Sequence, residues 1–195
     1  MDAIELADYR AAVARLYLSP GGLDEFRARR DELFATHPQS PIPAADRAGF
    51  TGLRYFPPSD DAIVETELRA EPGRLEIDTG GPDGVVRYER VGVLDTPWGG
   101  LSLWWIAAYG GGLFLPVRDG TSGKQTYGGG RYLTDTVKGT HGRGLTVLSD
   151  HRVRLDFNYA YNPSCAYDDR WVCPLAPRDN WLAGPVPAGE LTYHA

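Results

Sequence analysis

Two stretches of this sequence combine residue types that could perform chemistry on a small molecule. The first, residues 125–135, has three successive glycines followed by Arg131 and Tyr132. Glycine backbone can approach a ligand closely, and a guanidinium group binds an anion or a carbonyl oxygen. The alternative interpretation is a tight turn or bulge at the start of a strand, which is the commoner meaning of glycine in a strand pattern.

The second stretch, residues 152–158, alternates apolar and polar side chains as a half-buried strand does. Its polar face includes Asp156 and Asn158, and this face is either exposed to solvent, the commoner case, or the floor of a pocket. If the strand that begins at Arg131 is its neighbour, alternation favours pairing of Arg131 with Asp156. Such a pair would be either structural or catalytic, since a buried ion pair alone argues for neither role.

A loop rich in tyrosine follows directly, from Tyr161 to Tyr167, and we expect it to close over both stretches. Polar groups gathered among aromatic rings are typical of small-molecule pockets. The predicted catalytic residues are Arg131, which would bind an anionic or carbonyl group, Asp156 as an acid, a base or a group that orients a tyrosine, and Tyr161. The predicted binding residues are Tyr127, Gly129, Gly130, Tyr132, Asn158, Asn162, Cys165 and Tyr167.

No metal or cofactor is expected. The only cysteines are Cys165 and Cys173, and the four histidines have no H-x-H or H-x-x-x-H spacing, so a zinc site has little support. The glycine run fits neither a dinucleotide fingerprint nor a Walker loop. The two thiols could form a disulfide that closes a short loop, but reduced, structural cysteines are favoured, and no sequence cue supplies a base for Cys165 as a nucleophile.

Composition restricts the partners. The net charge of −6 and the isoelectric point near 5.2 argue against nucleic acid. No apolar run approaches the ~20 residues of a membrane helix, and the first residues lack the features of a secretory signal, so the expected location is cytoplasmic. Arginines far outnumber the two lysines, Lys124 and Lys138, so bound anions would meet guanidinium groups.

The expected elements form one domain of 195 residues. Apolar periodicity predicts helices over residues 2–18 and 23–36, with the charged run "RARRDE" on the face of the second helix opposite its apolar side. From about residue 50 the pattern changes to short β segments separated by turns. These segments are residues 62–70, 73–78, 84–94, 101–109, 113–119, 131–135, 145–150 and 152–158. The fold expected is mainly β, an antiparallel sandwich or barrel over residues 50–160, with the two N-terminal helices as a cap and an ordered C-terminal loop over residues 161–195.

Three motifs of the sequence are similar to those of a known family: "LFLPVRDGTSGKQTYGGGRYL", "LDFNYAYNPSCAYDDRWVCPLAP" and the late "AGE". They resemble domain of unknown function 1684, a family of uncharacterised bacterial and archaeal proteins. The resemblance covers about residues 23–190 and implies no mechanism. Two departures from the family pattern are Gln125, where a glutamate is usual, and Asn180–Trp181, where Asn-Arg is typical. The stretch "VKGTHGRGLTVLSDHR" is also longer than the usual turn.

Three classes of function remain open. The first is an enzyme that processes a small molecule, for example an anion, by acid–base chemistry (isomerase, cyclase, lyase or hydrolase type) without a metal or redox cofactor. The second is a non-catalytic module that binds a small molecule or a partner, and the third is a purely structural role for the motifs. The adjacent Trp104 and Trp105 put one large ring on each side of a strand. At least one of these rings must therefore pack in the core, in a pocket or against a partner, and a second copy of the chain could be that partner, as in a homodimer.

Overall fold

The computed structural model describes residues 2–78, 84–149 and 151–194. Within them, two helices precede eight strands. The helices are α1 (Ala3–Leu18) and α2 (Leu23–Thr36). The strands are β1 (Ile63–Arg69), β2 (Gly73–Asp78), β3 (Val85–Thr96), β4 (Gly99–Ile106), β5 (Gly112–Val117), β6 (Arg131–Asp135), β7 (Leu145–Ser149) and β8 (Arg152–Asp156).

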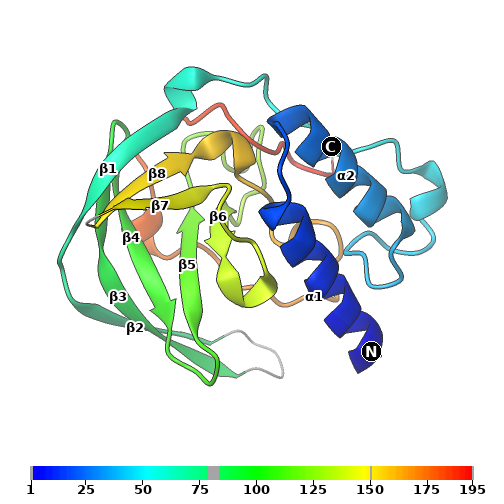
Figure 1. Ribbon diagram of the computed structural model, residues 1–195, viewed down its shortest axis with the longest axis horizontal. Helices are drawn as coiled ribbons and strands as arrows, with labels where there is room; N and C mark the ends of the chain where they lie inside the picture. The colour runs from blue at the N-terminus through cyan, green and yellow to red at the C-terminus, as the bar shows by residue number, and fades with distance from the viewer. Residues whose placement is uncertain (1, 79–83, 150, 195) are drawn as a thin grey trace.

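The strands form a single antiparallel sheet that curls into a half-barrel (Figure 1). Its order is β6-β5-β4-β3-β1-β8-β7, and β2 pairs with β3 off this path. Each of the eight β segments predicted from the sequence overlaps one of these strands, and β3, β4 and β5 extend one or two residues beyond their segments. Asp150, at the end of one segment, and Ala195, in the predicted loop, lie outside the described residues. The prediction of a mainly β antiparallel fold with two N-terminal helices is confirmed.

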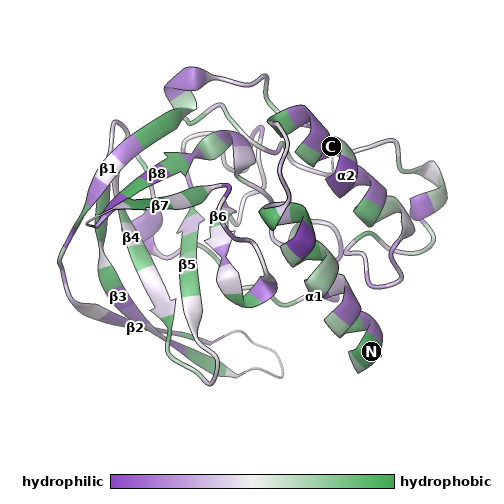
Figure 2. Cartoon of the chain, in the orientation of Figure 1, coloured by the Kyte–Doolittle hydropathy of each residue, from purple (hydrophilic) through white to green (hydrophobic). Residues whose placement is uncertain are grey.

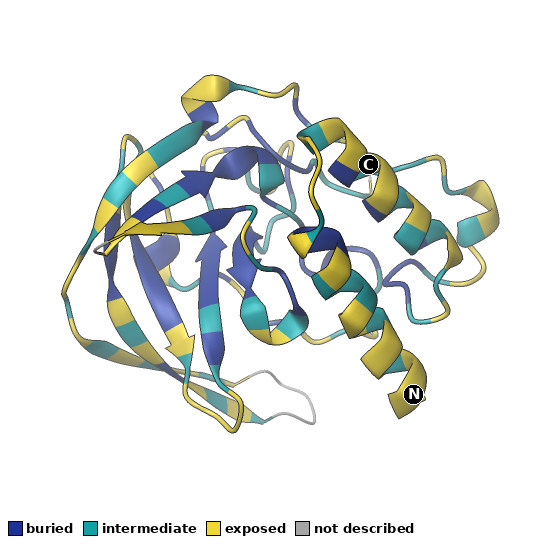
Figure 3. Ribbon diagram, in the orientation of Figure 1, coloured by how far each residue is buried: buried dark blue, intermediate teal, exposed yellow. Residues whose placement is uncertain are grey.

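The main core packs on one face of the curled sheet, to which period-2 alternation directs one side chain per two residues. Figure 3 shows that β5 and β6 are buried along most of their length. Leu94, Leu101, Leu115, Leu133 and Leu155 are completely buried there. The other face carries a second, aromatic cluster, which contains Tyr88, Trp104, Phe114 and Tyr132. Trp104 is thus buried and Trp105 is exposed, in agreement with their placement on opposite sides of β4.

The helices join the sheet through aromatic side chains of the segment that follows β8. Leu16, Tyr17 and Phe26 pack against Tyr159 and Tyr161. Farther along α2, a second cluster contains Phe34, Ile42 and Tyr167. Helix α2 is largely hydrophilic (Figure 2), yet its buried residues Phe26, Arg30 and Phe34 recur every four positions and form one stripe. The expectation that the whole charged run of α2 lies opposite the apolar face was therefore wrong for Arg30.

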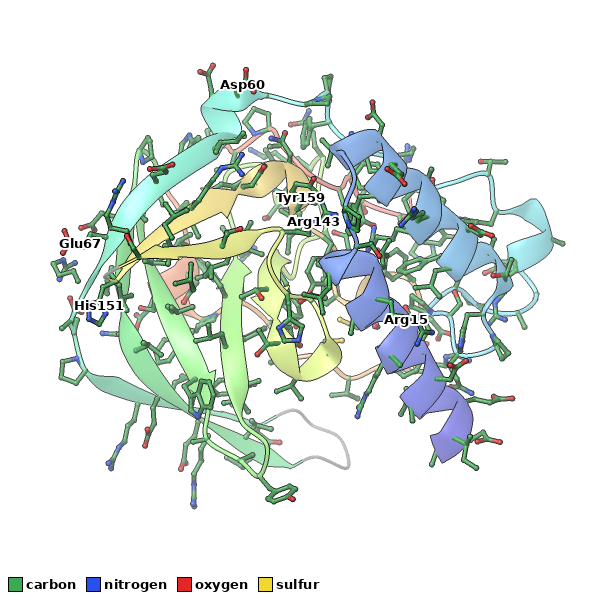
Figure 4. The ribbon with its side chains drawn as sticks, viewed as in Figure 1. Arg15, Asp60, Glu67, Arg143, His151 and Tyr159 are labelled. Atoms are coloured by element: carbon green, nitrogen blue, oxygen red, sulfur yellow. The ribbon has the colours of Figure 1, made fainter. Side chains whose placement is uncertain are left out.

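Both ends of α1 have specific partners. The Asp2 carboxylate accepts hydrogen bonds from the backbone N–H groups of Ile4 (2.9 Å) and Glu5 (3.1 Å), which is an N-cap. At the other end, Arg143 donates to the carbonyl oxygens of Tyr17 (3.1 Å) and Gly21 (2.8 Å) and to that of Ser19. Arg143 lies beside the hydroxyl of Tyr159 (Figure 4). One guanidinium group thus holds the α1 terminus to the sheet, and a positive charge suits that end of a helix.

Replacing Arg143 by alanine is expected to lower the free energy of unfolding by about 1.5–3 kcal/mol, because charge-assisted bonds to carbonyl oxygens are lost. Urea denaturation measures the change, and limited proteolysis in residues 19–22 reports detachment of α1. Arg143→Lys keeps the charge but cannot contact several carbonyls at once, so an intermediate loss is expected. Arg152, whose partner Glu65 is exposed, is the control. A loss no larger than that of Arg152→Ala would contradict this role.

Neither α1 nor α2, nor any other helix in the described ranges, has the length and apolar character needed to cross a membrane.

Candidate functional site

Arg131 begins β6 and is fully buried within the protein. Its guanidinium donates to the Asp119 carboxylate (2.6 Å), to the carbonyl of Val186 (3.2 Å) and to that of Ala188. Burial lowers the pKa of Arg131, and the neighbouring Asp119 carboxylate opposes that shift. The pairing with Asp156 expected from alternation does not occur, because β5, β4, β3 and β1 separate β6 from β8 in the sheet.

The glycine run allows a close approach of backbone, and its partner is the protein itself. Gly130 has a φ of +93°, and a Cβ atom there would lie 2.7 Å from the carbonyl oxygen of Val117 on the neighbouring strand β5. A Cβ at Gly129 would lie 2.6 Å from the ring of Tyr127. Only glycine fits where the chain passes this close to a neighbour. The run therefore sets the entry of β6 and so positions Arg131.

Asp156 ends β8 and accepts hydrogen bonds from the backbone N–H (3.1 Å) and the side-chain amide (2.9 Å) of Asn158. The Asn158 amide group in turn contacts the backbone of Ser59, as acceptor at 3.0 Å and as donor at 2.9 Å. These contacts tie the chain before β1 to the end of β8. Asp156 and Asn158 therefore hold two segments together, away from the cavity described next.

A small cavity of about 70 Å³ lies between the helical cap and the tyrosine-rich segment. Four of the predicted binding or catalytic residues line it: Tyr132, Tyr161, Asn162 and Tyr167. The other described residues on its wall include Tyr9 and Tyr17 of α1, Arg30 of α2, Lys138 of the short turn η3 (Thr136–Lys138), Thr140 and Ser164. The wall does not include the other predicted site residues, which are Arg131, Asp156, Asn158, Tyr127, Gly129, Gly130 and Cys165. The structure thus brings together the tyrosine-rich segment and the helices, rather than the segment and the glycine run.

Arg30, on one side of the cavity, belongs to a buried ion pair that joins α2 to the C-terminal segment. Arg30 lies 2.9 Å from the carboxylate of Glu190, and both side chains are almost fully buried. Glu190 also accepts from the backbone N–H (3.0 Å) and amide (3.1 Å) of Asn162 and from the hydroxyl of Tyr167. Burial is the largest single influence on the pKa of Arg30 and lowers it, but the Glu190 carboxylate and the neighbouring tyrosines together outweigh burial and leave that pKa well above its usual range.

Two residues of the cavity wall each carry a buried polar atom that has no partner among the described residues. These atoms are the hydroxyl of Tyr17 and the side-chain carbonyl of Asn162, both buried. Burial raises the pKa of Tyr17 above the ordinary phenol range, so its hydroxyl stays protonated at neutral pH and can donate. Buried polar groups nearly always have partners. An unpaired donor and an unpaired acceptor on two residues of one cavity wall are therefore candidate contacts for a bound molecule or for water.

A larger hollow of about 400 Å³ adjoins the cavity, and Tyr9, Lys138 and Ser164 line both. We call this hollow the mouth. Its described lining residues include the cations Arg10, Lys138 and Arg170 and no carboxylate. Part of that charge is balanced nearby, since Lys138 lies 4.0 Å from Asp135 and Arg170 lies 3.0 Å from Asp168. The mouth nevertheless gathers positive charge on a chain whose net charge is −6.

The fold and the cavity define a small, mainly β protein in which a helical cap closes an aromatic cavity against one antiparallel sheet. The model of the family described as "Protein of unknown function (DUF1684)" matches residues 48–191, so this chain belongs to that family, as its motifs predicted. The chain is also similar to the solution NMR structure of an uncharacterized protein of Haloarcula marismortui, with 40% identity and a TM-score of 0.60. The similarity covers 87% of this chain and 92% of that one. Among curated proteins, none matches the chain.

Sequence reasoning missed Arg30, Glu190 and Tyr17 as residues of the site. Glu190 was visible only as part of the late "AGE" motif, without a role. Arg30 could have been found, because residues 26, 30 and 34 share one helical face. Tyr17 carried no signal, since an aromatic residue near the end of an amphipathic helix is usually a core residue.

Proposed function

We propose that this protein binds a small organic anion, with an uncharged group in the tyrosine-lined cavity and the charged group at the mouth. The observation that carries the proposal is the unpaired, buried hydroxyl of Tyr17 in a cavity that opens towards cations. Ligand pockets are typically aromatic or apolar, with a few convergent polar groups that fix orientation. The Tyr17 hydroxyl and the Asn162 carbonyl would supply the orienting hydrogen bonds.

The size of the cavity limits what enters it. A water molecule needs roughly 10–15 Å³ of cavity space, so about 70 Å³ holds a group of a few heavy atoms. The remainder of the ligand would occupy the mouth, which offers about 400 Å³. This division favours a molecule with a compact uncharged end and a carboxylate or phosphate group at the other end, because Arg10, Lys138 and Arg170 would neutralise its charge.

Binding is better supported than acid–base catalysis. No carboxylate is among the described residues that line the cavity, and the predicted catalytic groups Arg131 and Asp156 are engaged in contacts within the protein. Burial raises the pKa values of Tyr161 and Tyr167 well above the phenol range. These hydroxyls would therefore donate hydrogen bonds at neutral pH rather than act as bases. Acid–base turnover of the bound anion remains a prediction for an activity assay.

A reducing, cytoplasmic location fits this proposal, and the support for it is that Cys165 and Cys173 are both free thiols. A homodimer also remains a prediction. Its support is the exposed ring of Trp105 on β4, and sedimentation analysis would test it.

The test is a thermal-shift and calorimetric screen of small aliphatic and aromatic carboxylates and phosphate monoesters. A ligand that binds is expected to raise the melting temperature, with an effect that falls as salt is added. Tyr17→Phe should weaken its binding about threefold to tenfold, the equivalent of one hydrogen bond. This substitution removes an unpaired hydroxyl, so the unliganded protein should be no less stable.

Arg10→Gln provides the test of charge, and Arg15→Gln is its matched control. Both arginines are exposed on α1, but only Arg10 lines the mouth. Affinity should fall for Arg10→Gln and stay unchanged for Arg15→Gln. A ligand whose affinity is the same for the wild type, Tyr17→Phe and Arg10→Gln binds elsewhere and would refute this site.

A further inference from the structure

The two cysteines lie together beside the mouth, a placement that the binding proposal does not use. Cys165 belongs to the short turn η5 (Ser164–Ala166), and Cys173 follows a loop of seven residues, 166–172. Both thiols are free, both cysteines line one surface hollow, and each thiol influences the pKa of the other. The hydroxyl of Tyr127 lies 3.6 Å from the Cys165 sulfur.

The sulfur of Cys173 is surrounded by groups that stabilise a thiolate. The Cys165 thiol, the backbone N–H groups of Cys165 and Ser164, and the positive charge of Lys138 all act on it. The Cys165 thiol contributes most to lowering the pKa of Cys173, burial opposes it, and Lys138 lowers it further. The pKa of Cys165 is raised, first by Cys173 and then by burial. One sulfur is thus prepared as a nucleophile and the other as its protonated neighbour.

Two surface hollows border this pair. Cys173 lines the mouth, and both cysteines line a second surface hollow of about 470 Å³ on the side of Ile77 and Leu175. Cys165 is partly exposed and Cys173 is buried, so a reagent would approach the Cys173 sulfur through the hollows that Cys173 lines. A cysteine buried for packing alone would not combine a thiolate environment, a second thiol on the wall of the same hollow and two neighbouring surface hollows.

We propose that Cys165 and Cys173 form a reversible redox site that takes low-molecular-weight disulfides as its oxidants. The Cys173 thiolate attacks one sulfur of the small disulfide, which breaks the S–S bond, forms a mixed disulfide and releases one small thiolate. Cys165 then gives up its proton and attacks the Cys173 sulfur, releasing the second small thiolate and leaving a Cys165–Cys173 disulfide. Two electrons pass from the protein to the small disulfide, and the two thiol protons end on the two small thiols.

The oxidised form would close the loop of residues 165–173 covalently. Arg170, Trp171 and Val172 in that loop line the mouth, so oxidation would restrict the wall of the mouth. The redox chemistry itself depends only on the two sulfurs and their neighbours, and it stands or fails independently of the proposed ligand.

The experiment exposes the full, folded protein to oxidised glutathione in buffers of graded glutathione ratio. Intact mass and the number of alkylatable thiols are then measured. The wild type is expected to lose both thiols together, with a mass lower by two hydrogen atoms, and dithiothreitol should restore both. Cys165→Ser should stop at one glutathione adduct on Cys173. Cys173→Ser should react at least about tenfold more slowly, since the lower-pKa thiolate is gone.

Lys138→Gln and Lys124→Gln complete the test, because they remove the only two lysines of the chain one at a time. Lys138 acts on Cys173 and Lys124 does not appear among the groups that do. Only Lys138→Gln should slow the first step at neutral pH. Glutathione adducts on both cysteines without an internal disulfide, equal rates for the two serine variants, or reaction only in denaturant would each overturn the proposal.

Discussion

Replacing Arg131 by alanine is expected to lower the free energy of unfolding by about 3–5 kcal/mol, because one partner of a buried ion pair is removed. The Asp119 carboxylate, whose side chain is fully buried, would lose its guanidinium partner. The carbonyls of Val186 and Ala188 would lose their donor as well. Urea denaturation of the variant measures the loss, and the slope of the transition checks that unfolding remains two-state.

Three controls separate the buried pair from a general effect of removing an arginine. Arg131→Lys keeps a positive charge but loses the planar guanidinium group that contacts several acceptors at once, so its loss of unfolding free energy should be intermediate. Adding Asp119→Ala to Arg131→Ala should recover part of the stability, because no unpaired carboxylate remains. Arg152→Ala breaks an exposed pair and should cost less than about 1 kcal/mol. If Arg131→Ala cost no more than Arg152→Ala, the structural role assigned to Arg131 would be wrong.

Replacing Glu190 by alanine should have an effect of similar size, about 3–5 kcal/mol, since it leaves the charge of Arg30 buried and unpaired. Asn162 and Tyr167 would lose their acceptor at the same time. This carboxylate joins α2 to the tyrosine-rich segment, so hydrogen exchange in α2 should accelerate more than exchange in the central strands. Chemical denaturation combined with amide exchange measures both effects.

The Glu190 substitution differs from that of Arg131 in its consequence for binding. Arg30, Asn162 and Tyr167 line the cavity, so a ligand found in the screen should bind Glu190→Gln more weakly, even where the protein remains folded. Glu190→Gln keeps the shape of the side chain and isolates the loss of charge. Glu65→Ala, which breaks the exposed pair with Arg152, is the stability control. Exchange in α2 as slow as in that control would show that the pair does not hold the helix.

The sequence determined the elements of this protein. Short runs rich in β-branched and aromatic residues, separated by turn residues, predicted segments that overlap all eight strands. Helical spacing and the stops at residues 19–22 and before Pro38 placed both helices. The motif around the triglycine run predicted the family, and the requirement for glycine there proved to be a close approach between β6 and β5.

Only the tertiary structure decided which side chains meet. Alternation gives the face on which Arg131 and Asp156 lie, but the order of the strands in the sheet puts four strands between theirs, and Asp119 becomes the partner of Arg131. The cavity likewise joins Tyr17, Arg30, Lys138 and Tyr161, which are far apart along the chain. A local pattern fixes the direction of a side chain relative to its own backbone, whereas the segment that covers it depends on how the whole sheet curls and where the helices pack.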